Sequence, residues 1–137
     1  AAPCGIDCFN CQLYETNLPT EAVAAVAKRL GITDDKLPCA GCREQKGCPV
    51  LPDKCSTLEC VTEKGFEFCF ECDEFPCTML QPAAYAADKL PHNLKVFNLL
   101  RIQKVGVGEW AEKEALEIRN KYFKGKFKIG SGPFLDD

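Results

Sequence analysis

The sequence predicts a small metal-stabilised α+β protein, in which an irregular cysteine-rich layer of zinc knuckles packs on a few α-helices with little sheet. Two observations indicate this class. Of 137 residues 11 are cysteine, and all of them precede residue 78. Residues 37–77 also show no long periodic hydrophobic pattern. A stretch of that length is seldom left unordered inside a compact domain, so bonds other than core burial are expected to order it.

The length is that of one domain, which we place at residues 1–137. Within it we expect a cysteine-rich metal-binding part at residues 4–80, a helical part at 81–130 and a loose tail at 131–137. The predicted conventional core lies in the helical part and consists of Leu94, Phe97, Leu100, Trp110 and Ile118.

The formal net charge of −3 is unevenly distributed. Residues 1–80 carry 7 basic against 13 acidic side chains, and residues 81–137 carry 10 against 7. A mildly acidic chain is a poor candidate for nucleic-acid binding. No apolar run approaches the roughly 18 residues of a membrane span, and no secretory leader opens the sequence. We therefore expect a cytoplasmic protein whose partner, if any, is another protein.

Four helices and one strand are predicted in order along the chain. Thr20 can cap a helix over 21–30, which Gly31 would end. Residues 82–90 indicate a short Ala-rich helix. Asn93 can cap a third helix with Leu94, Phe97 and Leu100 on one face, broken at Gly106. A last helix over about 109–123 and an edge strand around 126–129 follow, before a turn at 130–133. The apolar stripe of the last helix is Trp110, Ala111, Ala115, Ile118 and Tyr122.

The cysteines follow the spacing of metal ligands. They form three Cys-x2-Cys pairs with five further cysteines nearby, and pairs at this spacing can turn around one zinc ion as a knuckle. The pairs are Cys8/Cys11, Cys39/Cys42 and Cys69/Cys72, and the others are Cys4, Cys48, Cys55, Cys60 and Cys77.

With the only histidine, His92, the chain has twelve candidate ligands, enough for three tetrahedral sites. Grouping in chain order puts Cys39, Cys42, Cys48 and Cys55 in one site and Cys60, Cys69, Cys72 and Cys77 in a second. Cys4, Cys8 and Cys11 would then need a fourth ligand from His92, Asp7 or solvent. An interleaved grouping remains open, because closing a longer loop costs only about 0.6 kcal/mol per doubling of its length. His92 could also simply cap a helix.

Three other interpretations compete with zinc. A disulfide framework is disfavoured by the odd cysteine count and the paired spacing. An iron–sulfur cluster could use Cys4, Cys8 and Cys11, whose spacing is that of radical-SAM enzymes, although Asn10 stands where those enzymes usually carry an aromatic residue. Some cysteines could instead be buried apolar residues.

The motifs themselves resemble a known family. The opening Cys4-Gly5-Ile6-Asp7-Cys8-Phe9-Asn10-Cys11 with Tyr14, then Cys39-Ala40-Gly41-Cys42, resembles the cysteine-rich domain-of-unknown-function family numbered 3795. The resemblance is strongest over Cys55-Ser56-Thr57-Leu58-Glu59-Cys60, Glu63-Lys64-Gly65 and Cys69-Phe70-Glu71-Cys72-Asp73-Glu74-Phe75-Pro76-Cys77. It covers about residues 4–80 and implies a bacterial or archaeal intracellular protein with zinc sites. It implies no reaction.

Two functions of different classes follow. The first is a structural-zinc interaction module holding two or three zinc ions in closed sites and presenting a surface to a protein partner. The second is a metalloenzyme or redox protein that uses the Cys4, Cys8 and Cys11 motif, where one coordination position would be open. No Ser/His/Asp set and no phosphate-binding glycine loop supports another enzyme class. We favour the first.

Overall fold

The computed structural model describes residues 1–51 and 54–134. It is small and mostly helical. The helices are α1 (Val23–Leu30), α2 (Cys42–Gln45), α3 (Ser56–Lys64), α4 (Lys95–Val105), α5 (Val107–Glu109) and α6 (Ala115–Lys124). A π-helical turn, Trp110–Glu114, joins α5 to α6. One antiparallel hairpin pairs β1 (Lys126–Lys128) with β2 (Gly132–Phe134). Short 3-10 turns occupy Cys8–Asn10, Thr20–Ala22, Asp34–Lys36, Cys69–Glu71, Thr78–Leu80 and His92–Leu94. Of the predicted metal-stabilised α+β class, the small size, the few α-helices and the small amount of sheet are confirmed.

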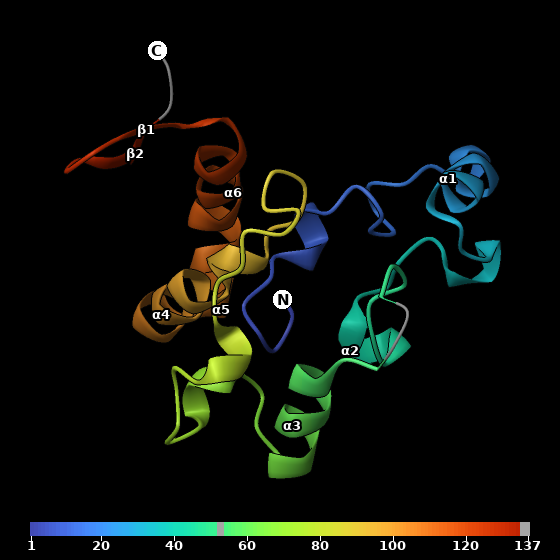
Figure 1. The fold of residues 1–137 in the computed structure, drawn as a ribbon. Coiled ribbons are helices and arrows are strands. Elements are labelled where there is room, and N and C mark those ends of the chain that lie inside the picture. The colour runs from blue at the N-terminus through green and yellow to red at the C-terminus, as the bar shows by residue number, and fades with distance from the viewer. Residues whose placement is uncertain (52–53, 135–137) are drawn as a thin grey trace.

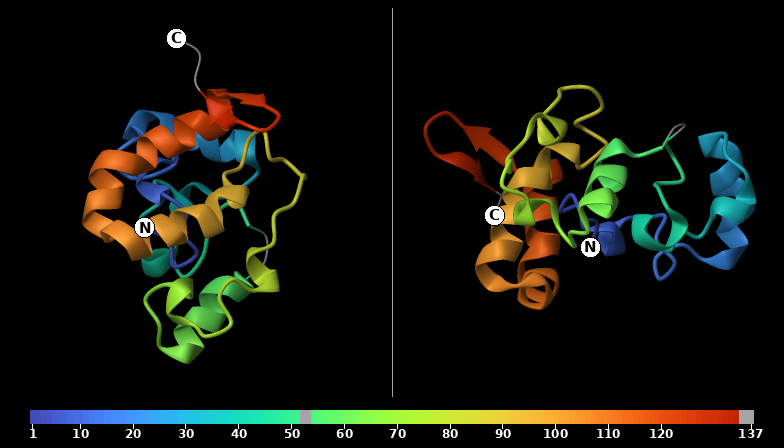
Figure 2. Two further views of the ribbon diagram at one scale, coloured as in Figure 1. Left: turned by 90° about the vertical axis from the view of Figure 1, so that its left-hand side faces the viewer. Right: turned by 90° about the horizontal axis from the view of Figure 1, so that it is seen from below.

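The chain forms three regions in space. The segment from α4 to the hairpin lies at one side of the molecule, α1 lies at the opposite side, and α2 and α3 lie between them near the N-terminal segment (Figure 1). The view from below shows the same separation (Figure 2, right). The N-terminal segment therefore meets both the carboxy-terminal helices and the cysteine-rich middle of the chain.

Two separate apolar clusters are buried. The larger one packs α4, the π-helical turn and α6 against α3 and the loop after it, and its buried members are Val61, Phe68, Cys69, Leu80, Leu99, Ile102, Trp110 and Ala115. The smaller lies under α1 and consists of Leu18, Ala27 and Leu37 with half-buried neighbours. Among the described residues, neither cluster's buried members include a residue of α2. Hydrophobic burial therefore contributes least where α2 meets the N-terminal segment.

Three predicted helices are present. The predicted helix over 21–30 is α1, which ends as expected at Gly31 in a left-handed conformation. The helix predicted after Asn93 is α4, and the last one spans α5, the π-helical turn and α6. Trp110 and Ala115 of its stripe are fully buried.

The predicted helix over 82–90 is wrong. This segment forms turns, in which Ala86 takes a positive φ of 51° and the N–H groups of Lys89 and Leu90 both bond to its carbonyl. The side chain of Asn93 holds the backbone of Ala83 instead of starting a continuous helix. The Ala-rich composition does not produce a helix here, because the free energy from helix propensity is small and tertiary contacts such as these override it.

The predicted buried face of α4 is also wrong. Phe97 and Leu100 are 53% and 48% exposed, whereas Asn98, Leu99 and Ile102 are buried together with Leu94. The helix is turned so that Asn98 and Leu99 meet the N-terminal segment at Gly5, a contact distant in sequence. Helical periodicity gives the spacing of a face, but not which of two candidate faces is covered.

Several elements were not predicted. The helices α2 and α3 form within residues 37–77, where no periodic pattern was found, and only Thr57 and Val61 of the nine residues of α3 are buried. The predicted turn at 130–133 includes the start of β2, so residues 132–134 of the predicted tail are in a strand. Residues 135–137 lie outside the described residues.

Candidate metal centre

The N-terminal motif is attached to the carboxy-terminal helices by two buried polar contacts. Asn98 of α4 donates its side-chain N–H to the carbonyl of Gly5 at 2.8 Å. Arg119 of α6 binds the Asp7 carboxylate through two hydrogen bonds of 2.7 Å, and Asp7 is 1% exposed. Asn10 donates a further bond to Asp7 at 3.0 Å. These contacts fix the backbone that carries Cys4, Cys8 and Cys11.

Gly5 allows this close approach. Its φ is +84°, and a Cβ atom placed there would lie 2.8 Å from the carbonyl oxygen of Lys95 and 2.9 Å from Cγ of Leu99. Only glycine avoids both the steric clash and the strain of a positive φ.

The second knuckle is joined to the first by the backbone. Cys39 donates its N–H to the carbonyl of Leu13 at 2.7 Å and accepts from Glu15 at 3.0 Å, which forms a short parallel bridge. Arg43, on α2, reaches the carbonyls of Ala1 and Glu67 at 3.1 and 2.7 Å. Segments far apart in the sequence thereby hold their cysteines close together.

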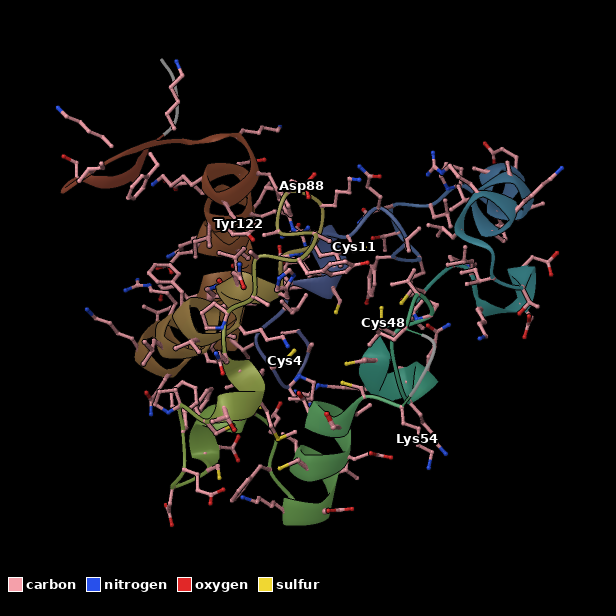
Figure 3. All side chains as sticks on the ribbon, in the orientation of Figure 1. Cys4, Cys11, Cys48, Lys54, Asp88 and Tyr122 are labelled. Atoms are coloured by element: carbon pink, nitrogen blue, oxygen red, sulfur yellow. The ribbon has the colours of Figure 1, made fainter. Side chains whose placement is uncertain are left out.

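One group of cysteines lies around the N-terminal segment and α2, where Figure 3 labels Cys4, Cys11 and Cys48. Cys8 is hydrogen bonded through its thiol to Cys42. Cys42 also interacts electrostatically with Cys4 and Cys55, and Cys4 with Cys8 and Cys55. Cys39 likewise interacts electrostatically with Cys8 and Cys11, and Cys48 with Cys39, Cys8 and Cys11. The seven cysteines of this group are Cys4, Cys8, Cys11, Cys39, Cys42, Cys48 and Cys55.

The remaining four cysteines form a separate group. Cys60 on α3 and Cys69, Cys72 and Cys77 on the loop after it line one cavity of about 380 Å³. Cys69 interacts electrostatically with Cys77 and Cys60, and also with Cys4 of the first group. Lys64 donates a hydrogen bond to the sulfur of Cys72 at 3.2 Å.

The surroundings of several thiols include donors that favour the thiolate. The N–H groups of Ile6, Gly41 and Val50, each two residues downstream, act to lower the pKa of the Cys4, Cys39 and Cys48 thiols, against the larger opposing effect of burial. The Gly41 bond measures 3.3 Å. Such backbone donors to sulfur are a common outer-shell feature of metal–thiolate sites.

Without a bound ion, burial opposes ionisation of these thiols. Burial raises the pKa of Cys4 and raises that of Cys69 to about 12. The hydrogen bond between Cys8 and Cys42 raises the pKa of Cys8 and lowers that of Cys42, since one thiol donates to the other. A divalent ion would remove this cost by binding the thiolates directly.

The cysteines form no disulfides. Their side chains lie near one another, but among the described residues they do not converge on a common position for an ion. All eleven cysteines are unpaired by disulfides. Within residues 1–51 and 54–134, no three Cys, His, Asp or Glu side chains converge tightly enough to form a ready-made ion site. The donor set nevertheless fits zinc, because each group offers soft sulfur ligands from several directions.

His92 and Asp7, the two candidate metal ligands that are not cysteines, contact other groups of the protein. His92 lies with Nε2 2.7 Å from the carbonyl oxygen of Ala83. Both carboxylate oxygens of Asp7 are bound by Arg119. The sequence interpretation gave no role to Arg43, Asn98 or Arg119, because their partners lie 24 to 112 residues away along the chain.

A family model described as "Protein of unknown function (DUF3795)" matches residues 1–82, more than half of the chain. The chain belongs to this family. The DUF3795 match includes every cysteine and ends before α4. Searches of curated proteins and of solved structures found no match. In the described part of this DUF3795 protein, no helix has the length and apolar character needed to cross a membrane.

Proposed function

We propose that this protein is a structural-zinc interaction module, in which two or three zinc ions bound by cysteine fix the shape of the DUF3795 region. The observation that supports this most is the gathering of seven thiols from four separate chain segments around α2, where apolar packing is sparse. Zinc would draw these sulfurs to about 2.3 Å and replace the missing core.

We favour a binding module over an enzyme because the proposed zinc sites would have every coordination position occupied by a thiolate. Four thiolates around zinc leave no position for a substrate. The enzyme alternative needs Cys4, Cys8 and Cys11 to share one open site, but Cys8 faces Cys42 of the second knuckle, a fourth thiol that would close that site. The protein would therefore act through its surface on another protein, since its acidic charge disfavours nucleic acid as a partner.

Metal analysis with circular dichroism tests this function. Protein purified without oxygen should contain two or three zinc ions per chain and no visible absorption band. Removing the metal with a strong chelator should abolish a large part of the helical signal, and adding zinc should restore it. A helical signal that is unchanged after complete metal removal would contradict the proposal. Finding iron and sulfide together with a visible absorption band would indicate that the protein holds an iron–sulfur cluster instead of zinc.

A further inference from the structure

The hairpin of β1 and β2 lies at the edge of the molecule and exposes apolar side chains. Figure 1 and the right-hand view of Figure 2 both show it projecting beyond α6. All three residues of β1 are exposed. Phe127 is 72% exposed, and Ile129, directly after β1, is 91% exposed. A hairpin of two short strands is only marginally stable in water, so pairing with a further strand would stabilise it.

The register of the hairpin decides which backbone groups of β1 point outward. Phe127 lies opposite Pro133, which has no N–H. A hydrogen-bonded pair in an antiparallel ladder exchanges two N–H···O bonds, so Phe127 and Pro133 form a non-hydrogen-bonded pair. The N–H and C=O groups of Phe127 therefore point away from β2. Within residues 1–51 and 54–134 this sheet has two strands, so no third strand pairs with these groups.

The outer edge of β2 offers less to an added strand. The backbone of Pro133 faces that edge and supplies a carbonyl but no N–H. Proline in an edge strand is one of the devices that prevent further pairing. The outer edge of β1 is therefore the side of the hairpin at which a strand can be added.

The charge around β1 is strongly positive, although the whole chain is acidic. Residues 118–134 contain five basic side chains and no acidic one. Arg119 and Lys121 form ion pairs on α6, and the other three are Lys124, Lys126 and Lys128, at the end of α6 and on β1. These lysines would repel β1 of a second copy, because like charges would lie opposite each other. They would attract a strand that carries carboxylates.

From this edge we infer that β1 is a docking strand for an extended acidic segment of a partner protein. The segment would pair with the Phe127 backbone as a third strand. Because successive side chains of a strand point to opposite faces, Lys126 and Lys128 share one face and Phe127 lies on the other. The matching segment alternates acidic and apolar residues.

The backbone groups of Phe127 favour a peptide over a nucleic acid. A peptide backbone offers a carbonyl for the outward N–H and an N–H for the outward carbonyl. A phosphodiester backbone offers acceptors only, which would leave that carbonyl unpaired. The inference rests on the proposed interaction function, since it names the surface and the chemistry of the partner. The hairpin lies outside residues 1–82, which match the family model.

The test uses the full chain as purified, labelled with 15N, and a capped synthetic peptide that alternates glutamate with valine. Binding should shift the amide signals of β1 and weaken as salt is added. The same peptide with lysine in place of glutamate should bind at least about tenfold more weakly. Single-stranded oligothymidylate is titrated in parallel, and sedimentation follows the oligomeric state of the chain alone.

Matched variants separate the backbone edge from the charge. Phe127→Pro removes the outward N–H and leaves the bonds to β2, so it should bind the peptide about tenfold more weakly than Phe127→Val, which keeps that N–H. Lys128→Glu should also weaken binding. Lys28→Glu makes the same charge change on α1, at the opposite side of the molecule, and should alter affinity less than about twofold.

Four results would overturn the docking strand. They are no peptide binding, equal binding of the two peptides, preferential binding of oligothymidylate, and dimerisation through β1. Equal losses for Lys28→Glu and Lys128→Glu would do the same. Zinc content and helicity are measured on the same sample, so a folded, zinc-containing chain that ignores the peptide leaves the structural-zinc function intact. The peptide comparison on the unmodified protein decides the question even if a variant does not fold.

Discussion

At the scale of single residues, a few side chains of the N-terminal segment determine how it meets the helices. Gly5 permits the backbone to approach α4, Asn98 binds the Gly5 carbonyl, and Arg119 neutralises the buried Asp7. Gly5, Asn98 and Arg119 are not themselves candidate metal ligands. They position the segment that carries Cys4, Cys8 and Cys11.

Substituting Gly5 by alanine is expected to destabilise the protein strongly. The new Cβ would overlap the backbone of α4 and force a side chain into a positive φ, which together cost about 2 to 5 kcal/mol. Gly31→Ala is the matched control, because Gly31 has a similar φ of +68° but open space around it, so only about 1 kcal/mol is expected. Denaturant unfolding measures both, and equal losses would contradict the close-approach argument.

Removing Arg119 should be costly because Asp7 would remain buried without a counter-ion. Breaking a buried pair in this way costs about 3 to 5 kcal/mol, so Arg119→Ala should unfold at much lower denaturant concentration. Lys121→Ala, which breaks the exposed pair with Glu117 on the same helix, should cost no more than about 0.5 kcal/mol. If both variants unfold at the same denaturant concentration, the contact between Arg119 and Asp7 does not anchor the N-terminal segment.

At the scale of elements, α4 and the π-helical turn are joined by an ion pair. Arg101 donates two hydrogen bonds to Glu114, at 2.8 and 2.5 Å. Glu114 is the last residue of the π-helical turn, where its φ of −118° departs from regular helix. The extra residue in a π-helical turn changes the direction of the side chains that follow it. This pair therefore holds the π-helical turn against α4, the helix that contacts Gly5.

The Arg101–Glu114 pair should make stability depend on pH. The hydrogen bonds from Arg101 lower the pKa of Glu114 in the folded protein. Its stabilisation is present above the pKa of an unfolded glutamate, about 4.3, and is lost as the pH falls through the lower folded value. Glu114→Gln should therefore melt below the unmodified protein at pH 7, and the difference should shrink toward pH 3.

Exposed Glu112 provides the control for this titration. Glu112→Gln on the same π-helical turn should leave the melting temperature close to that of the unmodified protein across the pH range. Comparing the two variants removes the common effect of acid on metal binding, because both retain every cysteine. A pH-independent effect of Glu114→Gln would exclude the ion pair as its cause.

At the scale of the whole molecule, we expect the cysteines to connect regions that apolar packing leaves separate. The cluster under α1 and the cluster around Trp110 share no buried residue, and α2 lies between the helices that carry them (Figure 1). Loss of metal should therefore release the DUF3795 region while the carboxy-terminal helices retain their own contacts.

Replacing a cysteine that binds metal should therefore lower the stability of the fold far more than replacing an exposed side chain. Cys72→Ser replaces a thiol that lines the cavity of the four-cysteine group. It should lower the melting temperature by many degrees, since metal binding supplies folding free energy. Lys113→Ala, which removes an exposed side chain paired with Glu109, should change stability by no more than about 0.5 kcal/mol. Equal melting temperatures would contradict a structural role for Cys72.

The sequence alone determined the family, the candidate thiol ligands and the helices with strong periodicity or caps, such as α1 with Gly31. These features are local, since spacing, capping and composition act within a few residues. Family membership likewise follows from the order of the cysteines along the chain.

Only the tertiary structure decided which cysteines are neighbours and which face of α4 is buried. Chain order favoured a local grouping of Cys39, Cys42, Cys48 and Cys55, whereas the fold places Cys42 against Cys8 and Cys39 beside Cys11. The entropy of loop closure separates such groupings too weakly to choose between them. Contacts such as those of Arg43 and Arg119 make the choice, and they join residues that spacing within one segment cannot relate.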